Sequence, residues 1–414
     1  MALEITSSQP DPSLLDLPWR LPLEEWPDDI LAALPRGISR HVVRFVRLDG
    51  KILAVKEIKA DIAAREYNML RNLRRLEMPS VEPYAVVAGR QSHTGEDLDA
   101  CLVTRHLQFS LPYRALYSQN LRKGTAVRLI DALAVLLVRL HLAGFWWGDV
   151  SLSNTLFRRD AGAFSAYLVD AETGELRERL SDGQREHDLD IARVNIAGEL
   201  MDLEAGGLLQ EDRDPIVVSE RIVERYRDLW DALTGSESIN AGERWRVDER
   251  IRALNKLGFD VDELAMTTDI GGTTITIQPK VVDSGHHSRR LLRLTGIDVR
   301  ENQARRLLND MMAYTAANDR QGEDEEIVAH DWVEEVYLPF VRAIPADLRA
   351  KLEPAEVFHE VLEHRWYMAE RAQHDFSITD ALADYLASVL PTKPDERSVV
   401  GVDTVEMPVT VLDD

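Results

Sequence analysis

The sequence predicts an α+β fold, in which a small antiparallel sheet with one helix precedes a helical lobe and a mostly helical C-terminal domain. Between residues 41 and 105, short segments with alternating apolar residues surround a single segment with helical periodicity. Beyond residue 111, long segments with helical periodicity dominate. The length of 414 residues suits two or three domains of ordinary size.

The composition restricts the functional classes. The net charge is -23, from 72 acidic and 49 basic residues, which disfavours binding to nucleic acid or to anionic membranes. The single cysteine, Cys101, excludes an intrachain disulfide and predicts a cytoplasmic protein, and its apolar neighbours predict a core position. No signal peptide is visible and no apolar run reaches 18 residues, so we expect no membrane span.

The predicted sheet begins after a leader. Residues 1–35 are rich in Pro, Leu and Trp and predict an irregular N-terminal leader that packs on the body. Alternating segments on both sides of Asp49-Gly50 predict a hairpin over residues 41–58, since Asp-Gly favours a two-residue turn. Asp61 is predicted to cap a helix over residues 62–75. Two further strands are predicted at residues 85–88 and 100–105.

The helical lobe alternates predicted helices with short strands. We expect helices at residues 111–120, 125–143, 188–203 and 217–233. Gly144 is predicted to end the second of them. The segment 145–149 is predicted to be a loop, and residues 155–158 and 166–169 are predicted to be strands.

A second domain is predicted after a linker at residues 234–242. Within a mostly helical domain of residues 243–390, we expect a helix at 244–257, a strand at 273–282, and helical regions at 288–318 and 328–390 around an acidic loop at 319–326. The tail, residues 391–414, is predicted to be disordered in part.

Four features in the first half supply what phosphoryl transfer from ATP needs. Lys56, in Leu-Ala-Val-Lys on a predicted strand, offers a cation for phosphates, and Glu66 on the next helix could pair with it. Asp149 and Asn154, four residues apart in a loop, and Asp170, at a strand end, offer the hard oxygen ligands that Mg²⁺ prefers. Each residue taken alone has an ordinary structural explanation. Lys56 could be a surface lysine, and Glu66 could belong to an ion pair on the helix face. Asp149 could form an Asx turn, and Asn154 and Asp170 could cap the segments that follow them.

Taken together and in this order, the motifs resemble the protein-kinase-like superfamily. They are most similar to the atypical branch of lipopolysaccharide kinases and aminoglycoside phosphotransferases, whose loop reads His-Gly-Asp, four residues, then Asn. The whole chain to about residue 390 also resembles a bacterial domain-of-unknown-function family, number 4032. The resemblance implies a bilobal kinase-like domain at residues 36–235 that binds ATP and Mg²⁺.

The resemblance also implies roles for single residues. Lys56 becomes the phosphate lysine with Glu66 as its helix partner, and Asp149 becomes the catalytic aspartate. Asn154 and Asp170 become the metal ligands.

Two further roles follow from the same resemblance. The segment 104–107, with Thr104 and His106, becomes the hinge that meets adenine through its backbone. Asp190, or alternatively Asp188, becomes the helix aspartate that supports the catalytic loop.

The chain departs from the family pattern at three places. Trp147 replaces the usual His, so we expect the loop to lose a hydrogen-bonding ring. Ala171-Glu172 replaces the Phe-Gly that follows the metal aspartate in typical protein kinases, a position at which small-molecule kinases also vary. Gly37 is the single glycine in the only candidate for a phosphate-binding loop, so backbone amides would cradle phosphates less closely.

Motifs in the second half predict less. His359 and His364 lie five residues apart, about 140° around a helix, whereas a zinc-protease helix needs a spacing of four. We therefore reject a zinc site there. His286-His287 with Arg289-Arg290 could bind an anion, but a polar helix start is the favoured interpretation.

The sequence thus predicts an ATP- and Mg²⁺-dependent phosphotransferase acting on a hydroxyl of a small-molecule or protein acceptor, which stays open. A nucleotide-binding pseudokinase or regulator without turnover is the alternative, supported by the three departures. A plain interaction protein is a third hypothesis, in which the acidic C-terminal helices dock a protein partner.

Overall fold

The computed structural model describes residues 2–32, 41–118, 124–209, 214–240, 243, 245–256, 258–268 and 274–397. Within these residues the chain forms two compact units. Unit 1 contains the residues up to 158 and residues 166–223, and unit 2 contains residues 159–165 and 224–397. Of the candidate phosphate-binding loop at 37–41, residues 37–40 lie outside the described residues, as does the tail from residue 398.

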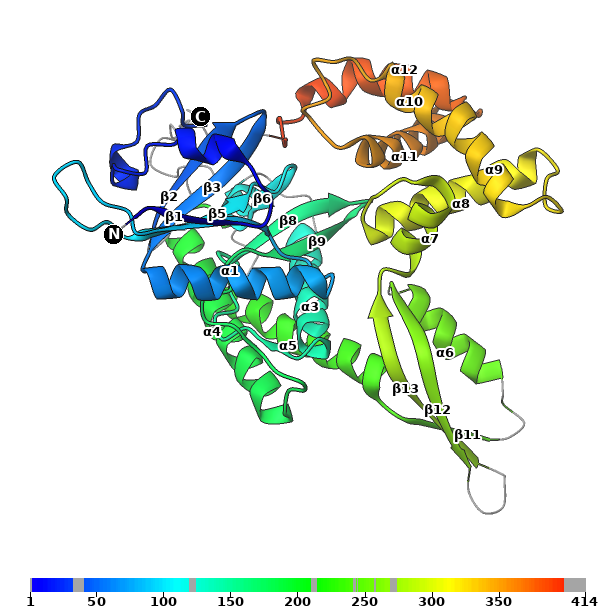
Figure 1. Ribbon diagram of the computed structural model, residues 1–414. Coiled ribbons are helices and arrows are strands. Elements are labelled where there is room, and N and C mark those ends of the chain that lie inside the picture. The colour runs from blue at the N-terminus through cyan, green and yellow to red at the C-terminus, as the bar shows by residue number, and fades with distance from the viewer. Residues whose placement is uncertain are drawn as a thin grey trace. The chain divides into compact units, whose positions relative to one another are not determined.

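Unit 1 begins with a five-stranded antiparallel sheet in the order β1-β4-β5-β3-β2 (Figure 1). The strands are β1 (Glu4–Ser7), β2 (Val42–Leu48), β3 (Lys51–Ile58), β4 (Glu82–Ala88) and β5 (Ala100–Arg105). The predicted hairpin is confirmed: Asp49 and Gly50 have φ of 46° and 74°, as a two-residue turn with both residues left-handed requires.

The N-terminal leader covers one face of this sheet. Leu14, Trp19 and Leu23 are buried in one apolar cluster with Leu53 and Val55 of β3, which alternate with residues on the other face. The leader contains two short 3-10 helices, Pro12–Asp16 and Leu23–Glu25. The leader is less irregular than predicted, because its residues in β1 pair with β4 and extend the sheet.

The helix α1 (Ala60–Arg75) packs on β4 and β5. The prediction that Asp61 caps this helix is wrong. Lys59 occupies the capping position and makes no side-chain cap, while Asp61 lies in the first turn. There its negative charge faces the positive end of the helix dipole, which accounts for an acidic residue at this place in the sequence.

The rest of unit 1 is mainly helical. Its elements are β6 (Ser110–Pro112), α2 (Tyr113–Ser118), α3 (Thr125–Leu142), β7 (Phe145–Trp146), β8 (Thr155–Asp160), β9 (Ala163–Leu168), β10 (Glu175–Leu176), α4 (Asp182–Ala205) and α5 (Pro215–Thr234), which continues into unit 2. The strands β6, β8 and β9 form one small sheet, and β7 pairs with β10. The segment predicted as a loop after Gly144 therefore begins with two paired residues.

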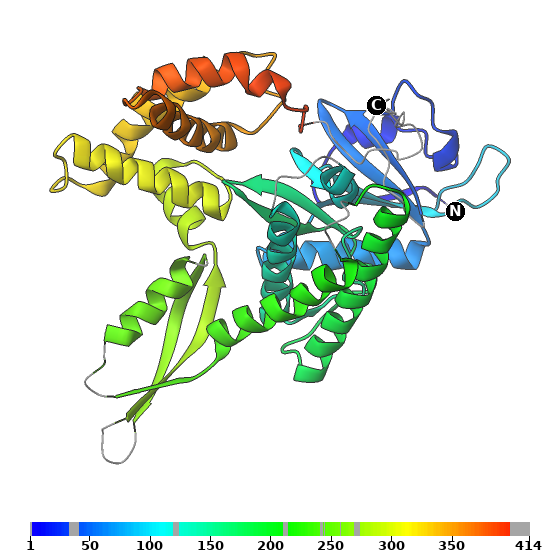
Figure 2. The ribbon, with the colours of Figure 1, turned by 180° about the vertical axis from the view of Figure 1, so that it is seen from behind.

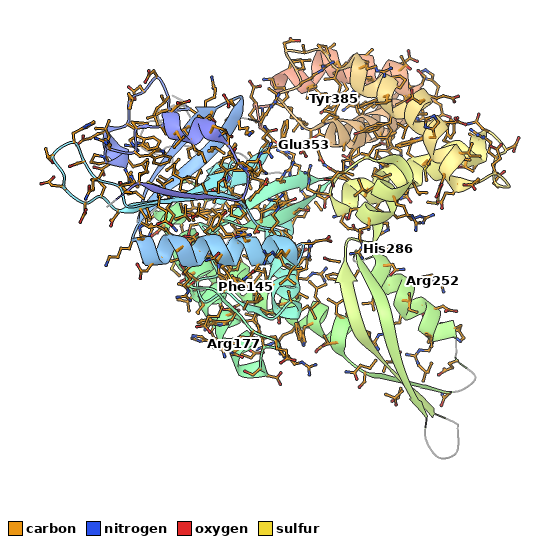
Figure 3. All side chains as sticks on the ribbon, viewed as in Figure 1. Phe145, Arg177, Arg252, His286, Glu353 and Tyr385 are labelled. Atoms are coloured by element: carbon orange, nitrogen blue, oxygen red, sulfur yellow. The ribbon has the colours of Figure 1, made fainter. Side chains whose placement is uncertain are left out.

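Gly144 ends α3 as predicted. It has a φ of 79°, and a Cβ at this position would collide with the backbone carbonyl of Arg177. That close approach brings the β7 residue Phe145 and the β10 segment before Arg177 together; both residues are labelled in Figure 3. Only glycine satisfies both conditions, so the position fixes how the chain enters the next loop.

Unit 2 opens with a three-stranded sheet, in the order β11-β13-β12, and a helix. These elements are β11 (Glu237–Asn240), α6 (Trp245–Lys256), β12 (Phe259–Thr268) and β13 (Thr274–Ser284). Figure 2 shows α6 lying along the β12–β13 hairpin. The strand predicted at 273–282 is confirmed, whereas β12 was missed, and the predicted linker contains β11.

The remainder of unit 2 is helical, as predicted. It consists of α7 (His286–Thr295), α8 (Glu301–Ala317), α9 (Glu325–Trp332), a π-helical turn at Val333–Tyr337, α10 (Leu338–Ala343), α11 (Pro354–Ala372), α12 (Ile378–Ser388) and a 3-10 turn at Leu390–Thr392. Its core contains Trp332, Phe340 and Phe358, whose rings make edge-to-face contacts. Among the described helices, none combines the length and the apolar character that a bilayer crossing needs.

Candidate active site

Strand β3 directs Lys56 into a cavity. Leu53 and Val55 face the leader, so Ala54 and Lys56 point to the opposite face of the sheet, where both line the cavity. β3 is held between β2 and β5, and Lys56 lies opposite Val43 and Leu102. A central strand therefore fixes the backbone that carries the ammonium.

Three carboxylates surround the ammonium of Lys56. Its Nζ lies 3.1 Å from Oε2 of Glu66, 2.8 Å from Oδ2 of Asp170 and 3.4 Å from Oε2 of Glu172. Glu66 was expected from the helix spacing and Asp170 from its strand end. Glu172 was missed, although it stands only two residues after Asp170.

The electrostatics of this cluster reflect an excess of negative charge. Burial alone would lower the pKa of Lys56, but Glu66 and Asp170 outweigh it and raise the pKa. Burial, reinforced by the charge of Asp170, raises the pKa of Glu66 to about 7, even with Lys56 opposing the shift. Three carboxylates surround one ammonium, so the cluster favours a further cation.

Asp188, not Asp190, supports the loop after β7. The Asp188 side chain is fully buried, and its two oxygens accept the backbone N–H groups of Trp147 and Gly148, each at 2.8 Å. His141 lies 3.1 Å from the same carboxylate. Asp190 points to solvent, with 73% of its side chain exposed, so its predicted supporting role is wrong and the stated alternative applies.

The prediction that Trp147 costs the loop a hydrogen-bonding ring is also wrong. Its indole Nε1 donates to the backbone carbonyl of Asp170 at 2.9 Å, and the ring is completely buried. Thr173 Oγ1 donates to the Trp147 carbonyl at 2.7 Å. These two bonds join the loop containing Asp149 to the loop containing Asp170.

Asp149 and Asn154 are joined directly. The Asn154 Nδ2 donates to the backbone carbonyl and to Oδ2 of Asp149, both at 3.0 Å. From α4, Asn195 Nδ2 lies 3.4 Å from the other carboxylate oxygen, Oδ1, and 3.1 Å from the Val150 carbonyl. Two amides thus orient the two oxygens of one carboxylate.

A second residue of α4 holds the same loop. Both oxygens of Glu199 accept backbone N–H groups, from Leu152 and Ser153, each at 2.8 Å. Burial raises the pKa of Glu199, although these hydrogen bonds oppose the shift. Sequence reasoning missed Asn195 and Glu199. The only signal was their four-residue spacing, which places them on one face of a predicted helix.

The predicted site residues line one cavity of about 800 Å³, a volume ordinary for a small-molecule site. They are Lys56, Glu66, Thr104, His106, Asp149, Asn154 and Asp170, and every further lining residue also belongs to unit 1. Gly198 of α4 contributes an open stretch of wall, since nothing lies within 4 Å of where its Cβ would be.

The predicted hinge, residues 104–107, lines this cavity with all four of its residues. The backbone N–H of His106 donates to the Ile52 carbonyl at 3.0 Å, so it does not face a ligand. The His106 side chain is buried, which lowers its pKa to about 4, and its Nε2 has no hydrogen-bond partner among the described residues. A buried polar atom of this kind normally has a partner, which a bound ligand can supply.

The residues present fit a nucleotide with a metal ion. The cavity offers an ammonium at Lys56 and side-chain oxygens of Asp149, Asn154 and Asp170, which are the groups that a triphosphate and Mg²⁺ need. The orphaned imidazole nitrogen of His106 lies on the wall of the same cavity.

The motifs of the second half find ordinary partners. Glu301 accepts from the backbone N–H groups of His287 and Ser288 at 2.7 and 3.0 Å, so a carboxylate occupies the start of α7, as the favoured interpretation expects. His364 pairs with Asp384 at 2.7 Å, and His359 lies 3.4 Å from Glu363. Over the described part of the chain, one acidic cluster alone has ligand atoms spaced for a metal, and it contains Asp170 but neither of these histidines.

Comparison with known proteins identifies two segments. Residues 51–197 match the sequence model of the Lipopolysaccharide kinase (Kdo/WaaP) family, and residues 228–390 match a Domain of unknown function (DUF4032). The search of curated proteins finds no match. The first match covers Lys56, Glu66, Asp149, Asn154 and Asp170.

A comparison with solved structures finds two chains with partial likeness. One is described as "WaaP in complex with acyl carrier protein", with a TM-score of 0.34 and 16% identity over 62% of this chain and 99% of the other. The second is an aminoglycoside-3'-phosphotransferase of type VIII, with a TM-score of 0.34 and 15% identity over 49% of this chain and 86% of the other. The chain thus joins a segment similar to lipopolysaccharide kinases, residues 51–197, to a segment similar to DUF4032 proteins, residues 228–390.

Proposed function

We propose that the protein is a phosphotransferase that uses ATP and Mg²⁺ to phosphorylate a hydroxyl group. The observation that carries this proposal is convergence: the Lys56 ammonium lies 2.8 Å from Asp170, and Asn154 lies 3.0 Å from Asp149, all on one cavity. The match of residues 51–197 to a kinase family supports the same reaction class.

Each residue has a defined task in this reaction. Lys56 binds phosphate oxygens, and Asn154 and Asp170 hold the metal. When bound, ATP would supply the phosphoryl group, and Mg²⁺ would supply the positive charge that the acidic cluster favours. Asp149 orients the acceptor hydroxyl and accepts its proton, while Asn154 and Asn195 keep the carboxylate aimed.

The hydroxyl acceptor reaches Asp149 past α4. The exposed side chain of Val194 and the open wall at Gly198 line the cavity on this side. Lipopolysaccharide is the acceptor class that the family name suggests.

A pseudokinase is the second candidate, and Glu172 is the observation that favours it. Its Oε2 lies 3.4 Å from Nζ of Lys56 and 3.3 Å from Nε2 of His41. The carboxylate therefore occupies a position beside the ammonium that a phosphate oxygen would need. A protein that binds nucleotide and keeps this contact would bind without turnover.

A nucleotide titration with four variants tests the proposal. ATP should raise the melting temperature of the wild type further with Mg²⁺ than without it. Lys56→Met should lose both shifts, and Asp170→Asn should lose the part that Mg²⁺ adds. Asp149→Asn should keep both shifts but lose ATP turnover by roughly 10²–10⁴-fold, the usual contribution of a general base. Asp190→Asn, exposed on α4, is the matched control.

The outcomes separate the candidates. Mg²⁺-dependent turnover that Asp149→Asn abolishes supports the phosphotransferase. Shifts without turnover in the wild type support the pseudokinase. A wild-type protein that shows neither a shift nor turnover contradicts both.

A further inference from the structure

The β8–β9 hairpin is shared by the two units. β8 begins and β9 ends in unit 1, whereas the tip between them belongs to unit 2. Residues 159–165 form this tip, which turns at Ala161 and Gly162 with φ of 49° and 82°. Its polar groups are buried among helices of unit 2: Asp160 is 1% exposed and its neighbour Gln303 is 1% exposed. Buried polar groups at a strand tip need partners, and the helices provide them.

Asp160 is held by three donors. Its Oδ1 accepts the backbone N–H of Gln303 at 2.8 Å, and its Oδ2 accepts Asn302 Nδ2 at 3.0 Å. Ser165, on the other strand of the hairpin, donates its hydroxyl to the same Oδ2 at 2.9 Å. The carboxylate therefore joins both strands of the hairpin to the first turn of α8.

Glu356 of α11 holds the turn itself. Its Oε2 accepts the backbone N–H of Ala161 and Nε2 of Gln303, both at 2.9 Å, and its side chain is buried. A Cβ on Gly162 would lie 3.3 Å from Nε2 of His359, one turn further along α11. A larger residue at 162 would therefore press on this helix.

Arg159 completes the contact. Its Nε donates to Glu396 at 2.8 Å, and its backbone carbonyl accepts Arg300 Nε at 2.7 Å. Arg300 in turn pairs with Glu353, which Figure 3 labels. Each of the two arginines at this contact is therefore paired with a carboxylate.

The opposite end of the same hairpin carries the proposed metal ligands. Asn154 immediately precedes β8, and Asp170 follows β9 by two residues. The Val169 N–H donates to the Asn154 carbonyl at 3.0 Å and closes the base of the hairpin. A displacement of the tip along the strands would therefore be passed to both ligands by the paired backbone.

We propose that the DUF4032 segment, residues 228–390, positions the metal ligands by clamping this hairpin, with Asp160 and Glu356 as positioning residues. A buried polar network is a costly way to pack two surfaces, since apolar residues of similar volume would stabilise them as well. It does, however, favour one position of the hairpin, because a shift of the tip would break the hydrogen bonds that Asp160 and Glu356 make. The metal-dependent part of this inference rests on the proposed function.

Two substitutions of Glu356 separate a positioning role from simple packing. Both hydrogen bonds end on one oxygen, so Glu356→Gln keeps an acceptor there, while Glu356→Leu removes it. Glu370→Leu makes the same change at an exposed position of α11 and is the matched control. Asn302→Ala, which removes one bond to Asp160, is a milder variant in case Glu356→Leu does not fold.

Two measurements on the full chain test the variants. The first is amide hydrogen exchange over residues 154–170 without nucleotide. The second is ATP binding as a function of Mg²⁺ concentration. Glu356→Leu should raise exchange in the hairpin and weaken the apparent Mg²⁺ affinity on the order of tenfold, as loss of outer partners of metal ligands does. Affinity for ATP without Mg²⁺ should stay within about twofold, because Lys56 is untouched. Glu356→Gln and Glu370→Leu should behave as wild type.

Each other result overturns a defined part. Unchanged hairpin exchange in Glu356→Leu, or in Asn302→Ala if the first does not fold, contradicts the clamp. If Glu356→Leu raises hydrogen exchange in the hairpin but its ATP binding depends on Mg²⁺ as in the wild type, the contact only packs the hairpin and does not position the metal ligands. That result also contradicts the proposal. Absence of Mg²⁺-dependent ATP binding in the wild type instead contradicts the proposed function, and the exchange measurement still decides whether the clamp orders the hairpin base.

Discussion

At the scale of single residues, the unexpected feature is that three carboxylates share the ammonium of Lys56. Its ammonium contacts two carboxylates that the sequence predicted, Glu66 and Asp170, and one that it did not, Glu172. Nucleotide phosphates would have to displace carboxylates from this cation. Glu172 is the one whose loss leaves the helix partner and the metal ligand intact.

Glu172→Gln should therefore strengthen ATP binding. The Glu172 side chain is 24% exposed, and a pair of this kind contributes up to about 1 kcal/mol, so we expect a gain of about two- to fivefold in affinity. Calorimetric titration with ATP measures it, and Glu178→Gln, exposed nearby, is the control. Weaker binding would instead mean that Glu172 itself helps to hold the metal.

Glu66 predicts a pH dependence of stability. Its pKa rises from 4.5 to about 7 in the folded protein, mainly through burial. The folded state then binds a proton that the unfolded state releases, so this group stabilises the fold fully below pH 4.5. That contribution disappears as the pH rises through 7 and amounts to at most about 3 kcal/mol.

Urea unfolding at pH 5 and pH 8 measures this effect. The wild type should lose stability relative to Glu66→Gln between the two pH values, because glutamine does not titrate. A constant difference between the two proteins would show that Glu66 stays ionised throughout.

At the scale of elements, α4 orders the loop that carries Asp149. Three residues on one helix reach this loop: Asp188 accepts two N–H groups before Asp149, Asn195 contacts Asp149 itself, and Glu199 accepts two N–H groups after it. Their spacings of seven and four residues keep them on one face of the helix. The loop geometry thus depends on α4, although the two are far apart in the sequence.

Asp188→Asn and Asp190→Asn form a matched pair that tests this dependence. Asparagine at 188 replaces an acceptor oxygen with a donor next to two N–H groups, and we expect a loss of roughly 3 kcal/mol in the free energy of unfolding. ATP turnover should fall with it. Asp190→Asn should stay within about 0.5 kcal/mol of wild type, as exposed substitutions do. Equal effects of the two changes, in denaturation and turnover assays, would contradict the assignment.

At the scale of the whole molecule, each unit closes its core with a distant segment of chain. In unit 1, Arg90 fastens the leader to the sheet. It is 1% exposed and donates to the carbonyls of Trp19 and Leu21, at 3.1 and 2.6 Å, and to Glu57 at 2.5 Å. In unit 2, the helices take up the hairpin tip at residues 159–165.

Arg90→Met should therefore destabilise the protein by about 3–5 kcal/mol, since it leaves the largely buried Glu57 without its cation. Limited proteolysis should cut the leader near Trp19 faster than in the wild type, and urea unfolding gives the loss in stability. Arg74→Met removes an arginine that is 55% exposed and paired with Glu82, so it should cost less than about 1 kcal/mol. A leader that stays protected in Arg90→Met would contradict this role.

Local patterns accounted for most of the first unit. The hairpin at Asp49-Gly50, the end of α3 at Gly144, the strand after Asn154 and the strand before Asp170 follow from turn chemistry and apolar periodicity, which act over a few residues. The strand β12 was missed, since its pairing with β13 is a tertiary contact that a weakly alternating segment does not announce.

The sequence by itself determined the fold class and the order of Lys56, Asp149, Asn154 and Asp170, because short-range periodicity and motif spacing are written along the chain. Only the tertiary structure decided that Asp188 takes the supporting role. Packing places that carboxylate against the loop's N–H groups and leaves Asp190 in solvent. The tertiary structure likewise decided that the Trp147 indole donates a hydrogen bond to the Asp170 carbonyl and that Glu172 reaches Lys56. These contacts join residues far apart in sequence, where distance and burial, not composition, set the interaction energy.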